Sequence, residues 1–220
     1  MKNRLNKIEF LGSYGSDEII ACSAWTSTSR DLTPKKKARV QKLLDMLWSE
    51  GHETPFEKTL LHFLIDTDIA SHIHLIKHRI GVSVNAESGR YKELKEDKFY
   101  IPSDWGLDDT LDKWANILYS MSEETNGLYH QCLKELEPIL GRKRAKESAR
   151  FFKMYNSQIQ SDVTFNMRSF AHFLGLRMSE HAQLEIREIA TEMYNYVKKL
   201  PQFKFTMIAI DLYTLGKKEI

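Results

Sequence analysis

The longest regular pattern in the sequence is an apolar stripe over residues 107–140, and it constrains the fold more than any other feature. The side chains of this stripe are Leu111, Trp114, Ile117, Leu118 and Met121. They recur at the three- and four-residue spacing of one helix face, which predicts helix across the segment. The Asn126-Gly127 pair is a turn signal, so we expect two helices here rather than one.

Shorter helical and extended patterns fill the rest of the chain. Expected helices cover 17–24, 34–50, 66–79, 142–152, 169–176 and 181–200, and expected strands cover 8–11, 59–65 and 158–165. Residues 203–215 fit either a strand or a helix. Because the 220 residues contain no internal repeat and no linker-like segment, we predict a single domain over residues 1–220. Its class is α+β, rich in helix, with a small mixed or antiparallel sheet.

The charge balance, the cysteines and the lack of long apolar runs argue against several classes of protein. The 32 basic and 30 acidic residues leave a formal net charge of +2, whereas non-specific nucleic-acid binding usually requires a strong basic excess. Cys22 and Cys132 are far apart and outside any CxxC pair, so we expect no disulfide framework and a reducing, cytoplasmic location. No apolar run reaches the roughly 18 residues of a transmembrane helix, so no membrane partner is expected.

A cluster of titratable side chains follows the strand pattern at 59–65. On the expected helix, His74 and His78 are i,i+4 neighbours, an arrangement that suits zinc, while His72 points elsewhere. No acid follows at the spacing of an HExxH motif, and the charges of Lys77 and Arg79 would repel a divalent cation and attract an anion. A metal-dependent hydrolase using the three histidines is one interpretation, and ordinary hydrogen-bonded surface histidines are another.

The next polar motif, Ser88-Gly89-Arg90, combines a hydroxyl, an open backbone and a guanidinium fork. Together these groups can hold a phosphate or carboxylate, although the same composition fits a plain turn. Arg168 with His172, and Arg177 with His181, repeat an i,i+4 spacing that fits a helix face lining an anionic ligand or a solvated charged face. A non-catalytic nucleotide-binding protein therefore also accounts for these motifs.

Six sequence blocks occur together and in order between about residues 50 and 190: HETPFE, KHR, SGRY, FYIP, NMRSFAHFLGLR and HAQLEI. Their combination resembles the flavin-dependent thymidylate synthases. The resemblance implies a methyltransferase that converts dUMP to dTMP, with methylenetetrahydrofolate as carbon donor, NADPH as reductant and FAD as hydride carrier. It also implies that no cysteine attacks the pyrimidine, and that the protein is a homotetramer with active sites between subunits.

The same resemblance implies a role for individual residues. The FAD-contacting positions would be Ser27, Thr54, Lys77, His78, Arg79, Asn166, Arg168, His172 and His181. The nucleotide-contacting positions would be His74, Lys77, Glu87, Ser88, Gly89, Arg90, Arg150 and Arg177. Arg177 would be catalytic, because a guanidinium at the uracil favours ionisation at N3. No metal site is implied.

The chain departs from the family pattern near the nucleotide loop. Lys77 stands in place of an arginine, His74 in place of a common glutamine, Ala86 in place of an acid or amide, and His172 in place of a common asparagine. Eight residues separate the KHR triplet from Ser88, one more than is usual in the family. Glu87 follows Ala86 directly, and we expect it to supply the missing acid.

Overall fold

The computed structural model describes residues 6–106 and 108–216. The chain forms two compact units. The hairpin unit comprises the N-terminal residues up to Lys7, Asp66–His74 and Asn85–Ser161. The core unit comprises Ile8–Ile65, Leu75–Val84 and the chain from Asp162 onward.

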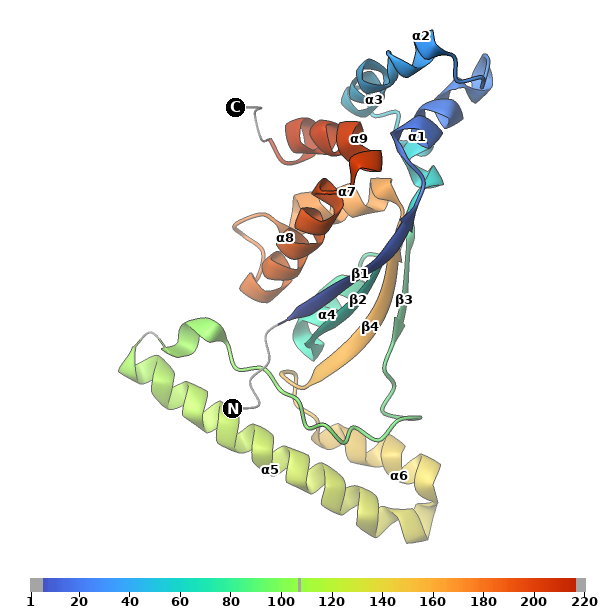
Figure 1. Cartoon of the computed structure of the whole chain (residues 1–220). Coiled ribbons are helices and arrows are strands. Elements are labelled where there is room, and N and C mark those ends of the chain that lie inside the picture. Colours follow the sequence, from blue (N-terminus) through green and yellow to red (C-terminus); the bar gives the residue numbers. More distant parts are fainter. Residues whose placement is uncertain (1–5, 107, 217–220) are drawn as a thin grey trace. The chain divides into compact units, whose positions relative to one another are not determined.

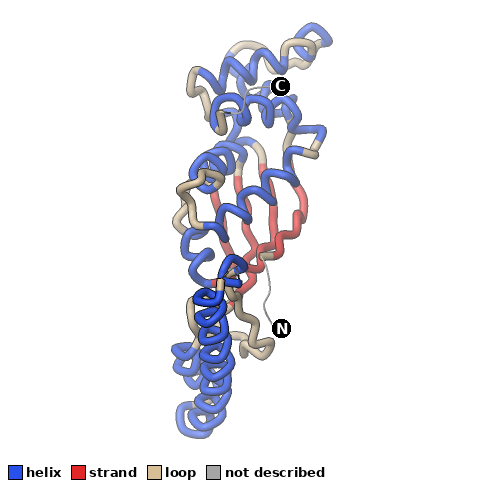
Figure 2. The backbone as a smooth tube through the Cα atoms, turned by 90° about the vertical axis from the view of Figure 1, so that its left-hand side faces the viewer, coloured by secondary structure: helices blue, strands red, loops and turns tan. Residues whose placement is uncertain are grey.

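A four-stranded antiparallel sheet contributes residues to both units (Figure 2). Its strands are β1 (Lys7–Tyr14), β2 (Leu60–Asp68), β3 (Val82–Ala86) and β4 (Gln158–Phe165), in the order β1-β2-β4-β3. Strands β1, β2 and β4 confirm the three that the sequence predicts. The short edge strand β3 is missing from the prediction, because only Val82 and Val84 mark its inner face between polar neighbours.

The core unit holds most of the helices. They are α1 (Asp17–Ala24), α2 (Pro34–Lys37), α3 (Val40–Ser49), α7 (Met167–Arg177), α8 (Leu184–Lys198) and α9 (Lys204–Ala209). Short 3-10 turns cover Trp25–Ser27, Thr54–Lys58 and Pro201–Phe203, and a π-helical turn covers Ile210–Thr214. The segment 203–215 is therefore helical. The single helix expected over 34–50 is wrong: it breaks at Ala38, where Arg39 N–H makes a tighter bond to the Lys36 carbonyl.

Aromatic packing fixes α7 against the sheet. Phe170 of α7 lies 6.1 Å from Phe63 of β2, and Phe173 lies 5.3 Å from Phe165 of β4, as distances between ring centroids. All four side chains are fully buried. Burial of each such side chain contributes roughly 1.5–3 kcal/mol, so this contact holds the start of α7 in a defined place.

Helix α4 (Ile69–Ile76) is shorter than expected. Asp68 caps it, because its Oδ1 accepts a 2.8 Å hydrogen bond from Ser71 N–H. The helix ends in a tight turn in which His78 N–H bonds the Leu75 carbonyl. The predicted end at Arg79 is therefore wrong, and His74 and His78 do not share a helix face.

The hairpin unit is built on α5 (Asp109–Leu140) and α6 (Arg142–Ala149), which lie side by side around a small buried cluster (Figure 1). A 3-10 turn, Arg150–Phe152, follows α6, and another, Ser103–Gly106, precedes α5. The predicted break at Asn126-Gly127 is wrong. Asn126 is buried and its amide bonds the Asp97 carbonyl and Lys153 Nζ, so its polar groups serve tertiary contacts and not a turn.

Within residues 6–106 and 108–216, the apolar stripe of α5 is largely exposed. The side chain of Trp114 is 52% exposed and that of Met121 is 47% exposed, with Leu111 and Ile117 also at the surface. Contiguous exposed apolar side chains of this size usually mark a contact surface. In the part of the chain that the structure describes, no helix has the length and hydrophobicity needed to cross a membrane.

Candidate active site

The loop Lys77–Gly81 connects α4 to β3 and is fastened to the start of α7. Ser169 Oγ donates a 2.6 Å hydrogen bond to the Ile80 carbonyl, and Asn166 N–H donates to the Gly81 carbonyl at 3.0 Å. Asn166 is also the N-cap of α7, since its Oδ1 accepts from Ser169 N–H at 2.8 Å. The predicted KHR triplet therefore has a fixed path although it lies in a loop.

Gly81 makes this attachment feasible. Its φ of +66° lies in the left-handed region that glycine enters without strain. A Cβ on Gly81 would lie 2.2 Å from Asn166 Nδ2 and 2.3 Å from Ser169 Oγ. The loop can approach α7 this closely only because no side chain stands between them.

A cavity of about 630 Å³ opens beside this loop, entirely within the core unit. Five predicted flavin-contacting residues line it: Lys77, His78, Arg79, Arg168 and His172. Sequence reasoning missed the remaining lining residues, which are Trp48, Glu53, Ile80, Val82, Ser169, Ala171 and Thr214. The volume suits a small-molecule ligand. Trp48 precedes the HETPFE block and Thr214 lies far beyond the last block, so only the fold brings both to this cavity.

Arg177 does not line this cavity itself, but it contacts His78, which does. Its Nε donates a 3.0 Å hydrogen bond to His78 Nε2. Because a guanidinium has no acceptor, His78 must accept through a neutral ring that carries its proton on Nδ1. The ring is further held edge-on against Phe173, with centroids 5.1 Å apart. Among the described residues, Arg177 Nη1 and Nη2 have no hydrogen-bond partner, so they remain available to a ligand.

The cations around the cavity differ in their pairing. Arg168 is bound by two acids, with Nε 2.7 Å from Glu53 Oε2 and Nη1 2.6 Å from Glu57 Oε1. Its charge is therefore matched within the protein, which raises the pKa of the guanidinium through the hydrogen bond to Glu57. Lys77 and Arg79 are exposed and have no ion-pair partner within residues 6–106 and 108–216. These two charges would attract an anion to the cavity.

Other predicted flavin residues do not line the cavity. Ser27 ends a 3-10 turn, where its hydroxyl donates to the Ala24 carbonyl at 3.4 Å. Thr54 opens the turn that carries Glu57. His181 is exposed between α7 and α8. All three belong to the core unit, and their predicted contact with FAD stays a prediction.

The predicted nucleotide loop lies in the hairpin unit, against the end of α6. Gly89 packs on Arg150: a Cβ built on the glycine would lie 3.5 Å from Arg150 Cβ. Ser88 Oγ accepts a hydrogen bond from Arg90 N–H at 3.3 Å, and Arg90 Nε donates to Glu147 Oε1 at 3.0 Å. The fold thus brings Ser88-Gly89-Arg90 and Arg150 together from positions some 60 residues apart in sequence, while His74 lies half-buried on α4.

Glu87 is already engaged by its neighbours. Its backbone N–H donates to the Gln160 carbonyl at 2.9 Å, and its Oε2 accepts from Gln160 N–H at 3.1 Å. Its Oε1 accepts from Lys92 Nζ at 2.5 Å. The carboxylate therefore braces the end of β3 against β4, a role that the sequence did not indicate.

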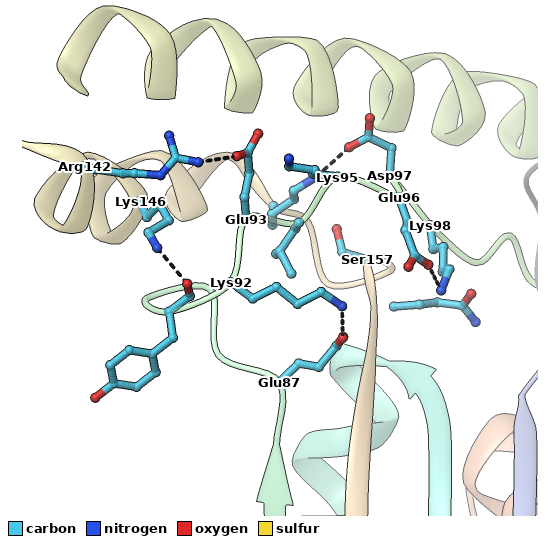
Figure 3. Close-up of a pocket in the computed structure, with 14 residues that line it drawn as sticks. Glu87, Lys92, Glu93, Lys95, Glu96, Asp97, Lys98, Arg142, Lys146 and Ser157 are labelled. Carbon is cyan, nitrogen blue, oxygen red and sulfur yellow. Dashed lines mark hydrogen bonds and ion pairs between the residues drawn. The ribbon is translucent and has the colours of Figure 1, made fainter. Parts of the chain in front are cut away.

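A second cavity, of about 440 Å³, lies in the hairpin unit behind the nucleotide loop (Figure 3). Charged side chains dominate its lining: Glu87, Lys92, Glu93, Lys95, Glu96, Asp97, Lys98, Arg142, Lys146 and Lys153. Glu93 binds Arg142 Nη2 at 3.0 Å, and Lys146 Nζ donates to the Tyr91 carbonyl at 2.6 Å. These pairs join the loop to α6, and none of them followed from a sequence motif.

The histidines do not form a metal site. His72 is buried, and its Nδ1 lies 3.0 Å from Ser161 Oγ. Burial lowers the pKa of His72, which keeps the ring neutral. Among the residues the structure describes, no three His, Cys, Asp or Glu side chains are grouped so that they could hold a metal ion. The metal-dependent hydrolase interpretation therefore has no site in this part of the chain.

Two features of the structure suit anionic, phosphate-bearing ligands. One is the cavity with the unpaired cations Lys77 and Arg79, and the other is the loop at Gly89 that packs on Arg150.

The family described as "Thymidylate synthase complementing protein" matches residues 10–201. The flavin-dependent thymidylate synthase of Pseudothermotoga lettingae is 30% identical over 199 residues, which cover 88% of this chain and 85% of that protein. The enzyme of the same name from Thermosipho africanus is 34% identical over 193 residues, covering 84% and 82%.

A solved structure has the same fold. The UMP/dUMP methylase PolB from Streptomyces cacaoi, bound with 5-Br dUMP, aligns with a TM-score of 0.84 over 96% of this chain and 97% of that one, at 24% identity. The chain belongs to the thymidylate synthase complementing protein family, whose relatives are the flavin-dependent thymidylate synthases. The predicted family, and with it the prediction of a methyltransferase enzyme, is confirmed.

Gly81→Ala should destabilise the protein more than the matched change Gly51→Ala. Both glycines have left-handed φ values, +66° and +71°, but space around Gly51 is open. Backbone strain alone should cost Gly51→Ala about 1 kcal/mol. The added clash with Asn166 and Ser169 should raise the cost at Gly81 to about 2 kcal/mol or more. Equilibrium urea unfolding measures both, and equal losses would contradict the close approach of loop and helix.

Proposed function

We propose that this protein is a flavin-dependent thymidylate synthase that methylates dUMP to dTMP, with methylenetetrahydrofolate as carbon donor, NADPH as reductant and FAD as hydride carrier. The observation that carries the proposal is the hydrogen bond from Arg177 to His78 at a cavity lined by Lys77 and Arg79. In a member of this family, it places the predicted catalytic arginine beside the predicted flavin triplet. The names of the curated relatives support the same activity.

The core-unit cavity fits the flavin role. Lys77 and Arg79 would bind the pyrophosphate of FAD through their unpaired charges, while Trp48 and Ala171 provide apolar wall for a planar ring. Arg168, His172 and Ser169 complete the lining, and Asn166 holds the loop. We assign Ser27, Thr54 and His181 to the flavin on the resemblance alone. FAD itself supplies the hydride chemistry, and these residues supply position and charge.

The hairpin unit fits the nucleotide role. Ser88, Gly89 and Arg90 would offer a hydroxyl, backbone N–H groups and a guanidinium to the phosphate of dUMP. Arg150 is exposed beside Gly89 and has no partner among the described residues, so its charge is available for the same phosphate. His74, Lys77 and Glu87 are assigned to the nucleotide by the resemblance, with Glu87 acting through the brace that it forms at the end of β3.

Arg177 would act on the base of the nucleotide. His78 fixes Nε, so the two Nη groups can face the uracil with little remaining freedom. A guanidinium held there would stabilise negative charge at N3, and the ring polarised in this way could accept hydride without a covalent adduct to the enzyme. No cysteine is required. Neither Cys22 nor Cys132 lines either of the two cavities described above.

Self-association completes the proposal. On the resemblance to the family, we propose a cytoplasmic homotetramer in which residues 1–220 form one catalytic domain and active sites lie between subunits. The stripe on α5 provides an unused apolar surface for a second copy. Folate and NADPH would be co-substrates, without a nucleic-acid or membrane partner.

The purified protein should be yellow and should convert dUMP to dTMP when methylenetetrahydrofolate and NADPH are supplied. Bound flavin is measured by visible absorbance and dTMP by chromatography. Each co-substrate is omitted in turn as the control. A protein that binds dUMP but makes no dTMP in the complete mixture would instead be the non-catalytic nucleotide-binding protein that the motifs also allow.

Arg177→Ala should reduce turnover far more than stability. Loss of a guanidinium that stabilises developing charge should lower kcat by at least about 100-fold. A half-buried arginine with one hydrogen bond should contribute no more than about 1 kcal/mol to the free energy of unfolding. Arg187→Ala on α8 is the matched control, because among the described residues its guanidinium donates a hydrogen bond to the Glu180 carbonyl and to no other group. Parallel losses of turnover and stability would mark Arg177 as structural.

Trp114→Glu should dissociate the assembly without unfolding the subunit. The substitution places a charge in the exposed stripe of α5, where a partner copy would have to bury it. Light scattering should show a smaller particle, while circular dichroism remains that of the wild type. Lys134→Glu, an exposed charge change on α5 outside the stripe, should leave the particle mass unchanged. A tetramer that survives Trp114→Glu would place its interfaces elsewhere.

A further inference from the structure

A compact charged cluster lies behind the nucleotide loop, around Asp97. The Asp97 carboxylate accepts hydrogen bonds from His130 Nε2, at 3.0 Å to Oδ1 and 2.9 Å to Oδ2, and from Lys153 Nζ at 3.0 Å. Its backbone carbonyl accepts from Asn126 Nδ2 at 3.3 Å. Among the described residues, Asp97 is the only residue other than glycine with a positive φ, which is +48°. The loop is therefore held at this point in a conformation that most side chains avoid.

Lys153 is the cation of this cluster and is nearly buried, with 5% of its side chain exposed. Besides Asp97, its Nζ donates to Asn126 Oδ1 at 2.6 Å and lies 4.4 Å from the centre of the Tyr129 ring. A buried ammonium is costly unless such partners surround it. The position of Lys153 is consequently well determined by α5.

Two chain segments that carry predicted nucleotide residues converge on this cluster. Lys153 closes the 3-10 turn that begins at Arg150, through its N–H bond to the Arg150 carbonyl at 3.1 Å. Asp97 ends the loop that begins at Ser88, and Leu94 N–H of the same loop donates to the Tyr129 hydroxyl at 3.0 Å. The pairing of Asp97 with Lys153 thus sets the loop relative to Arg150.

The loop also touches α6 and α5 at its other charged positions. Figure 3 shows the carboxylates of Glu93 and Asp97 turned toward α5, with Glu93 bound to Arg142. The Glu93 pair involves an arginine that is 54% exposed, and exposed pairs contribute little. The nearly buried pair between Asp97 and Lys153 is therefore the one that fixes the geometry.

We propose that Asp97 and Lys153, with Asn126 and His130 as their supports, are positioning residues that hold Ser88-Gly89-Arg90 and Arg150 at the separation needed to bind the phosphate of the nucleotide substrate. This inference rests on the proposed function. None of the four residues lines the core-unit cavity, so the cluster should govern nucleotide affinity and leave the chemical step unchanged.

The test compares the charge-removing variant Asp97→Asn with the same change one residue away, Glu96→Gln. Asparagine tolerates a positive φ and has the shape of aspartate, so Asp97→Asn keeps the backbone. It removes the negative charge and replaces one of the two oxygens that bind His130 and Lys153 by an amide NH2 group. Glu96 is 57% exposed and pairs with Lys98 at the surface. Affinity for dUMP is measured by equilibrium dialysis, and KM and kcat by dTMP formation.

Asp97→Asn and Lys153→Met should each raise KM and Kd for dUMP about tenfold, with kcat at saturating dUMP and bound flavin within about threefold of wild type. The double variant should be no weaker than the weaker single variant, because the pair acts as a unit. Glu96→Gln should match wild type. If Lys153→Met does not fold, Asp97→Asn decides alone.

Two outcomes overturn the inference in different ways. If Asp97→Asn matches Glu96→Gln in KM and Kd, or lowers kcat rather than affinity, the cluster does not position the nucleotide site. If the wild-type protein itself neither binds dUMP nor forms dTMP, the proposed function fails, and this inference fails with it.

Discussion

The predicted flavin site depends on how the loop Lys77–Gly81 is attached to the start of α7. Two carbonyls of that loop accept hydrogen bonds from Ser169 and Asn166, which are themselves joined by the N-cap of the helix. Phe170 and Phe173 then tie the helix to the sheet. A loop bearing two unpaired cations would otherwise be mobile, because like charges repel and exposed backbone offers no restraint. The attachment to α7 holds this loop in place as one wall of the core-unit cavity.

Pairing of charges separates structural cations from those available for ligands. Arg168 and Arg90 are each matched by glutamates, whereas Lys77, Arg79 and Arg150 have no such partner among the described residues. A sequence motif cannot make this distinction, since all five residues lie in polar, charge-rich stretches of the sequence. The charges of Lys77, Arg79 and Arg150 are therefore the ones that an anionic ligand could neutralise, whereas Arg168 and Arg90 already have carboxylate partners within the protein.

The sequence predicts much of the fold, and its errors have physical causes. Periodicity located three of the four strands and most helices, because their apolar faces are buried in one core. Asn126-Gly127 was misjudged as a turn, since the groups that Asn126 binds, Asp97 and Lys153, lie 29 and 27 residues away. The motifs identified the cavity residues from Lys77 to Arg79, but Trp48, Thr214 and the Asp97 cluster depend on long-range packing that no local pattern encodes.

The continuity of α5 links two regions that a broken helix would keep apart. Its 32 residues form a rod of about 48 Å. The first third bears the exposed stripe around Trp114, and the middle bears Asn126, Tyr129 and His130, which hold the nucleotide loop. Because an uninterrupted helix moves as one piece, a second molecule bound to the stripe would also restrict the motion of Asn126, Tyr129 and His130. If the proposed homotetramer forms through this stripe, assembly and substrate affinity would both depend on the same helix.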